Sequence, residues 1–117
     1  MGAKEQFMTR VTDLYKFEAI QGHLGWDQET IMPAKGAKAR GEILAWLAGQ
    51  RHSRLIDDEM GDLIATLENG EHDDYFSANL KEMRRKYDEA VKLPTEIVSQ
   101  FTKARSEALI AWQKARS

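Results

Sequence analysis

The three histidines, His23, His52 and His72, are the candidates for metal binding or catalysis in this sequence. His72 lies within residues 71–74 (Glu-His-Asp-Asp), the densest group of possible metal ligands, because carboxylates and imidazole bind several divalent metals. Adjacent residues do not readily converge on one ion, whereas a carboxylate before a helix accepts hydrogen bonds from its free backbone N–H groups. We therefore expect Asp73 or Asp74 to cap the following helix, with a metal site as the alternative.

The other two histidines lack the partners that catalysis requires. His23 precedes Trp26 and Asp27, but a catalytic His–Asp pair needs a nucleophile, and the sequence has no cysteine and no G-x-S-x-G pattern. We expect His23 at the end of the first helix, where a histidine interacts favourably with the helix dipole. His52 has two arginine neighbours, and we expect it in a solvated basic helix end or as a dipole partner.

A segment of mixed aromatic, acidic and turn-forming residues runs from Leu24 to Pro33. Glycine and proline bracket it, and both residue types favour the ends of helices. Two carboxylates in this segment do not define acid–base chemistry without a pocket to hold them. We expect a packed structural connection between two helices, in which Trp26 is an anchor by burial and Asp27 accepts backbone hydrogen bonds within the loop. The residues assigned to this structural loop are Trp26, Asp27, Gln28, Glu29 and Pro33.

We expect the basic residues to form ion pairs rather than a nucleic-acid surface. Lys81, Arg84, Arg85 and Lys86 are the strongest basic run, but acidic residues lie nearby at spacings that predict ion pairs along a helix. Seventeen basic residues against nineteen acidic residues give a net charge of −2, without the clustered basic excess of nucleic-acid-binding proteins.

The composition, 42% hydrophobic and 31% charged over 117 residues, is typical of one folded domain, assigned here to residues 1–117. The absence of cysteine excludes disulfides. No apolar run approaches the ~20 residues of a membrane span, and residues 1–10 lack the apolar core of a signal peptide. These observations predict a soluble, cytoplasmic protein with no membrane partner.

Apolar residues recur at helical spacing along the chain, which predicts an all-α fold: four to five helices packed as an antiparallel bundle. We expect helices over about 4–23, from 34 or 35 to about 55, from 57 or 58 to 68, over 74–92 and from 94 or 95 onward. In the last helix, the expected apolar stripe is Ile97, Phe101, Ala104, Ala108 and Trp112. Phe17, Ile31 and Trp46 lie at the edges of the main stripes, where they suit contact with a partner.

Several motifs, in order along the chain, resemble the N-terminal region of the thermostable carboxypeptidase (carboxypeptidase Taq) family of zinc metallopeptidases. They occupy residues 25–33, 37–40, 44–49, 93–98 and 111–116, and include the sequences GWDQET, LPTEIV and AWQKAR. The resemblance implies a mostly helical homodimeric enzyme that removes C-terminal residues from peptides with zinc or a similar ion. It also implies a deep substrate groove that the N-terminal helices help to cover.

The catalytic motif of that family, His-Glu-x-x-His, is absent, since no histidine is followed by glutamate with a second histidine four residues on. We therefore assign no catalytic, cofactor-binding or metal-binding residue, and expect this chain alone to be inactive. The last helix has no stop signal, which favours continuation in a longer protein; C-terminal fraying is the alternative. The expected partners are the remainder of the parent enzyme and a second copy of the chain, and a stand-alone helical interaction module is the alternative function.

Overall fold

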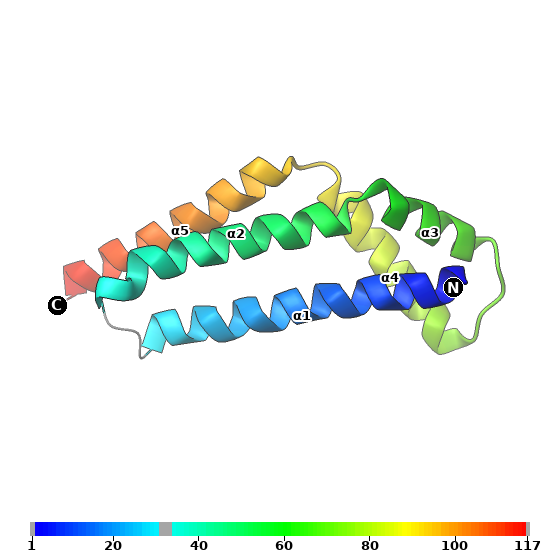
Figure 1. Cartoon of the computed structure of the whole chain (residues 1–117), viewed down its shortest axis with the longest axis horizontal. Helices are drawn as coiled ribbons and strands as arrows, with labels where there is room; N and C mark the ends of the chain where they lie inside the picture. Colours follow the sequence, from blue (N-terminus) through cyan, green and yellow to red (C-terminus); the bar gives the residue numbers. More distant parts are fainter. Residues whose placement is uncertain (1, 31–33, 117) are drawn as a thin grey trace.

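The computed structural model describes residues 2–30 and 34–116, and the regular elements of this part of the chain are all helices, joined by short turns (Figure 1). The all-α prediction is confirmed. The elements are α1 (Ala3–Thr30), the short 3₁₀ helix η1 (Ala34–Gly36), α2 (Ala37–Leu55), α3 (Asp58–Glu68), α4 (Asp74–Ala90) and α5 (Thr95–Arg116). None of the described helices is both long enough and apolar enough to cross a membrane.

Side-chain caps fix the beginnings of α3 and α4, and the cap at the start of α4 confirms the prediction for Asp73 or Asp74. The Asp57 carboxylate accepts a hydrogen bond of 3.0 Å from the backbone N–H of Glu59 at the start of α3. Asp73 accepts one of 2.7 Å from the N–H of Phe76 at the start of α4. Each cap satisfies a donor that the first turn of a helix leaves without a partner, and so sets where the helix begins.

The first helix is longer than predicted. It was expected to end near residue 23, but α1 continues to Thr30 through Gly22 and Gly25. Each helical glycine costs only about 1 kcal/mol, and packing of this end of α1 against α2 offsets that cost. The contacts include an ion pair between Asp27 and Arg40, described below.

The main hydrophobic core lies at one end of the molecule, where the first half of α1 meets α3, α4 and the end of α2 (Figure 1). Phe7, Met60 and Ile64 are its most completely buried side chains. The Phe7 and Phe76 rings meet edge to face, with centroids 5.8 Å apart, a favourable arrangement for aromatic pairs. The core residues of α3 are Met60, Ile64 and Leu67, and those of α4 are Phe76, Leu80, Met83 and Ala90.

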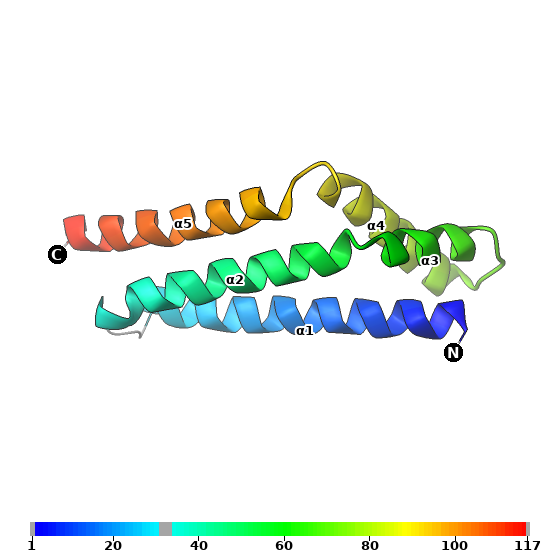
Figure 2. The same cartoon turned by 45° about the horizontal axis from the view of Figure 1, so that its top comes forward.

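At the other end, α2 lies between α1 and α5 and runs antiparallel to both, an arrangement visible in both views (Figures 1 and 2). The α5 helix packs chiefly on α2. The prediction that the apolar stripe of α5 is its packing face is wrong, since Phe101 is 65% exposed and the rest of the stripe is exposed too. The buried residue of α5 is instead Ser106, on the opposite side.

Small residues explain this orientation of α5. A Cβ atom added to Gly41 in α2 would lie 2.9 Å from the Cβ of Ser106, and one added to Gly49 would overlap the Ser99 hydroxyl. The helices therefore approach closely through glycine and serine. Phenylalanine or tryptophan at these positions would force them apart, so the bulky stripe faces away.

Candidate functional site

The segment expected to form a structural loop is the last part of α1. Trp26, Asp27, Gln28 and Glu29 all lie within the helix, so the loop prediction is wrong for these four residues. Pro33 lies outside the described residues.

Side chains of this segment dock α1 onto α2. Arg40 Nη1 donates to Asp27 Oδ2 at 2.7 Å and to the carbonyl of Leu24 at 3.2 Å. Gln28 is 5% exposed and its Nε2 donates to the carbonyl of Ala37 at 3.4 Å. Asp27 therefore pairs with an arginine of the next helix rather than with backbone N–H groups of a loop. This ion pair is a helix-to-helix contact rather than a catalytic arrangement.

Trp26 was expected to be buried, but it is 58% exposed. Because the segment is helical, residue 26 falls on a different side of α1 from Gln28, which faces α2. Replacing Trp26 therefore does not carry the large loss of folding free energy that follows removal of a buried aromatic ring. Trp46 is exposed on α2 as well, which agrees with its expected place at the edge of a stripe.

The histidines are structural in different ways. His52 was expected at a solvated helix end or as a dipole partner, but it is 7% exposed. Its Nε2 lies 2.9 Å from the carbonyl of Ala90 and its Nδ1 lies 2.8 Å from the Thr95 hydroxyl. His52 thus joins α2 to the end of α4 and the start of α5. His23 is exposed in the interior of α1, not in its last turn, because the helix continues beyond it.

The cluster around His72 stabilises a helix junction. His72 Nε2 donates to the carbonyl of Leu67 at 2.7 Å, and its ring lies 4.6 Å from the Phe76 ring. Asp73 is the cap of α4. Within residues 2–30 and 34–116, no group of three His, Cys, Asp or Glu side chains is placed to hold a metal ion. The described residues therefore do not fit the metal that the family resemblance implies.

The basic run on α4 forms ion pairs, as predicted. Arg84 donates from Nε and Nη2 to the Glu68 carboxylate at 3.0 and 2.6 Å and also contacts Asp88 at 3.3 Å. Arg85 pairs with Glu82 and Glu89 on its own helix. The hydrogen bond from Arg84 lowers the pKa of the Glu68 carboxyl below its ordinary value of 4.5. The two arginines of the run are therefore both paired with acidic neighbours.

A hollow of about 570 Å³ contains an arginine that is paired in the same way. It is lined by residues of α1, the end of α2 and the start of α3. Arg10 on its wall contacts Asp57 at 3.5 Å and Glu59 at 2.5 Å. The other charged residues of its wall also have partners, since Asp13 pairs with Lys16 and Arg54 donates to Gln50.

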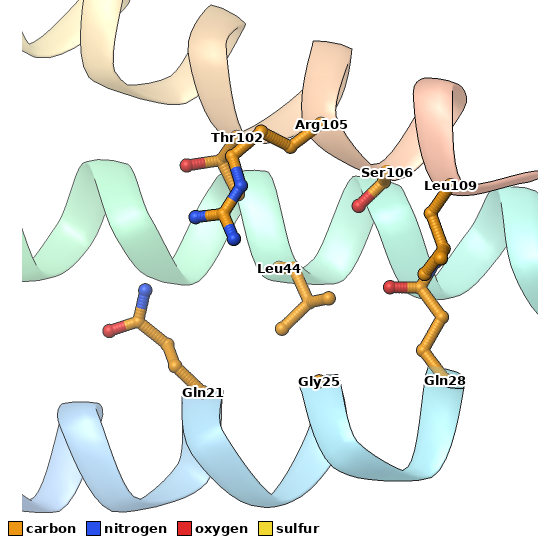
Figure 3. Close-up of a pocket in the computed structure, with 8 residues that line it drawn as sticks. All are labelled: Gln21, Gly25, Gln28, Leu44, Thr102, Arg105, Ser106 and Leu109. Atoms are coloured by element: carbon orange, nitrogen blue, oxygen red, sulfur yellow. The ribbon is translucent and has the colours of Figure 1, made fainter. Parts of the chain in front are cut away.

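A smaller polar pocket of about 220 Å³ lies among α1, α2 and α5 (Figure 3). Arg105 and Gln21 project into it from α5 and α1, and Leu44 lines it from α2 (Figure 3). The sequence-based expectations did not include this pocket. Its polar residues are far apart in the sequence and form no motif, so only the packing of the helices reveals them. It is the best candidate for a binding site in the described part of the chain.

Comparisons with known proteins agree with the motif order. The family model described as "Carboxypeptidase Taq (M32) metallopeptidase" matches residues 6–117. Thermostable carboxypeptidase 1 of Thermus thermophilus is 33% identical over 95 residues, which cover 78% of this chain. The matched region is 19% of that relative's length. No solved structure matches significantly. Because the family model matches residues 6–117, nearly the whole sequence, the chain belongs to the carboxypeptidase Taq (M32) metallopeptidase family.

Proposed function

We propose that this chain is the N-terminal helical part of a metal-dependent carboxypeptidase, an enzyme that removes C-terminal residues from peptides. The family match supports this proposal, and the aligned region spans about a fifth of the curated relative, so most of such an enzyme would lie outside it. In its finer form, the proposal is a zinc enzyme that is cytoplasmic and homodimeric.

The observation that carries the proposal is the exposed apolar stripe on α5. Ile97, Phe101 and Trp112 are all about half exposed or more, and Leu93 just before the helix is also exposed. A row of large apolar side chains on one helix face marks a surface that another protein surface covers. We assign the remainder of the parent enzyme to that role.

The shape of the chain agrees with this assignment. The radius of gyration is 17.2 Å, whereas a compact domain of this length has one of about 13 Å. The molecule extends 57 Å along its longest axis and 22 Å along its shortest. An elongated arrangement with its main core at one end is better suited to packing on a larger body than to acting alone.

The proposal places the metal ligands and the general base outside this chain. The sequence contains no His-Glu-x-x-His, and the described residues form no three-ligand group. We therefore derive no catalytic step from the residues present here. Their role in the proposal is structural: they form helices that help to cover the substrate groove.

An assay of the chain alone tests its proposed inactivity. We expect no release of a C-terminal residue from blocked dipeptides, with or without added zinc or cobalt, because the ligand pair and base are missing. The matched control is the same assay with the longer gene product under identical metal concentrations. Metal-dependent release by the chain itself, lost on addition of a chelator, would contradict the proposal.

The alternative is a stand-alone helical interaction module, which the same α5 stripe favours because its spacing suits docking into a partner's groove. The gene beyond the codon for Ser117 distinguishes the two functions. An in-frame His-Glu-x-x-His downstream supports the carboxypeptidase, and a stop codon directly after Ser117 supports the module.

A further inference from the structure

We propose that the pocket among α1, α2 and α5 binds the carboxylate of a small aliphatic acid, with Arg105 as the pairing cation. The site would be built entirely from this chain, and it requires neither the metal nor the catalytic residues of a peptidase. The proposal therefore goes beyond the carboxypeptidase function and can fail or succeed independently of it.

The first observation is that Arg105 differs from the other arginines. Seven of the eight arginines in the sequence have an acidic, amide or aromatic partner: Arg10, Arg40, Arg51, Arg54, Arg84, Arg85 and Arg116. Among the residues that the structure describes, Arg105 has no ion pair, hydrogen bond or ring contact. The pocket lining also contains no Asp or Glu. Its positive charge is therefore available to an anion from solution.

The second observation is that further donors line the same pocket without partners. Ser106 is 6% exposed, yet its hydroxyl has no hydrogen bond to any described residue. Gln21 likewise has no hydrogen-bonded partner within the described ranges, and its amide extends from α1 toward the space that Arg105 enters (Figure 3). Solvent still reaches the Ser106 hydroxyl and the Gln21 amide, and a ligand oxygen that accepts from them would replace that water.

The chemistry of the lining favours a carboxylate. A guanidinium donates two parallel N–H groups, which match the two oxygens of a carboxylate, and amide and hydroxyl donors can complete its hydrogen bonds. The more highly charged phosphate is matched less well than a carboxylate, because Arg105 is the one cation among the described residues of the pocket lining. Leu44 and Leu109 line the remaining wall and provide apolar contact for a short aliphatic chain. The volume of about 220 Å³ suits a small molecule of this kind.

NMR titration of the ¹⁵N-labelled chain with sodium butyrate tests the proposal at constant ionic strength. We expect saturable shifts of the Arg105 Nε, the Gln21 side-chain amide and the Ser106 backbone amide, with a dissociation constant in the millimolar range. Butyramide is the matched neutral ligand, with a similar shape but no charge, and should give no saturable shift. Inorganic phosphate forms a separate arm and should bind at least tenfold more weakly than butyrate.

Substitutions locate the binding site. Arg105→Gln should weaken butyrate binding by about tenfold or more, since a charge-assisted hydrogen bond is lost. The matched control is Arg116→Gln on the same helix, where the guanidinium lies 4.7 Å from the centre of the Trp112 ring. This control should leave butyrate binding unchanged. Thermal melts verify that each variant folds.

A second variant tests the pocket without changing its charge. Gly25 lines the pocket, and a Cβ atom added there meets no atom within 4 Å. Gly25→Leu should fill the space and abolish the butyrate shifts, whereas Gly25→Ala should leave room for the ligand.

Three results would overturn the proposal. They are butyrate shifts that do not saturate, shifts that persist in Arg105→Gln, and phosphate binding equal to or tighter than butyrate binding. None of these results bears on whether the longer gene product is a peptidase.

Discussion

At the scale of single residues, His52 shows how one polar side chain can hold three helices together. Ala90 O is an acceptor only, so the 2.9 Å contact requires that His52 Nε2 donate a proton. In the neutral ring Nδ1 is then an acceptor, and it receives the Thr95 hydroxyl proton at 2.8 Å. The ring thus satisfies a carbonyl at the end of α4 and fixes the first residue of α5 against α2.

His52→Ala should therefore lower the free energy of unfolding by about 2–3 kcal/mol, through two lost hydrogen bonds and the packing of a buried ring. Urea denaturation, followed by far-UV circular dichroism, measures the change. His23→Ala is the matched control, because His23 is exposed on α1 and its removal should change the value by less than ~0.5 kcal/mol. Equal effects of the two substitutions would show that His52 does not bridge the helices.

At the scale of the helices, Glu68 and Arg84 connect α3 to α4 through a two-pronged ion pair. The pKa of the Glu68 carboxyl is lowered, so its contribution to stability is present above the unfolded pKa. That contribution is lost as the pH falls through the folded pKa, below about 4.5. Solvent reaches both side chains, which limits the effect to less than about 1 kcal/mol.

A carboxyl-detected NMR titration should therefore give Glu68 a pKa below 4.5, and Arg84→Gln should raise it toward that ordinary value. Glu82 serves as the internal reference, because its lowered pKa is caused by the hydrogen bond from Arg85 and should not respond to the substitution at Arg84. An unchanged Glu68 titration in the variant would show that Arg84 is not the cause of the lowered pKa.

The contact between α2 and α5 depends on the absence of side-chain atoms at Gly41. Gly41→Ala adds a methyl group 2.9 Å from the Ser106 Cβ, which cannot rotate away. We expect a net loss of about 1–2 kcal/mol, because overpacking outweighs the gain in helix propensity. Gly22→Ala is the matched control: it meets no atom within 4 Å and should raise stability by about 0.5–1 kcal/mol. Urea denaturation midpoints compare the two, and stabilisation by both would contradict the close approach.

The sequence predicts where most helices begin and end, because those signals are local. Asp57 and Asp73 each precede a helix and accept a hydrogen bond from a backbone N–H two or three residues later, and Pro94 directly precedes α5. The sequence does not predict which face of α5 packs. An apolar stripe normally faces the core, but Gly41 and Gly49 on α2 leave room for the serine face of α5 to pack instead. This choice of face can be predicted only when the neighbouring helix is known. The end of α1 and the pocket at Arg105 depend on the same kind of distant contact.

At the scale of the whole molecule, the two ends of the chain are built differently. The end containing α3 and α4 buries a core of large apolar residues, among them Phe7, Met60 and Ile64. The end containing most of α5 buries mainly small and polar residues and leaves its bulky ones outside. We therefore expect the second end to depend more on a covering surface, either from a parent enzyme or from another copy of the chain.

In isolation, the chain should self-associate through the α5 stripe, because pairing removes exposed apolar surface from water and a net charge of only −2 opposes it weakly. Light scattering over a concentration series should show a rising average mass. Phe101→Gln should suppress this rise, whereas Tyr75→Gln should not, since Tyr75 is 81% exposed but lies on α4, away from the stripe.

A strictly monomeric, cooperatively melting chain at high concentration would contradict the prediction and favour the stand-alone module. Association that survives Phe101→Gln would place the contact elsewhere. A dimer lost in this variant would locate the contact on α5 without making it the dimer interface of the enzyme, because isolated chains also pair through surfaces that a longer protein buries internally.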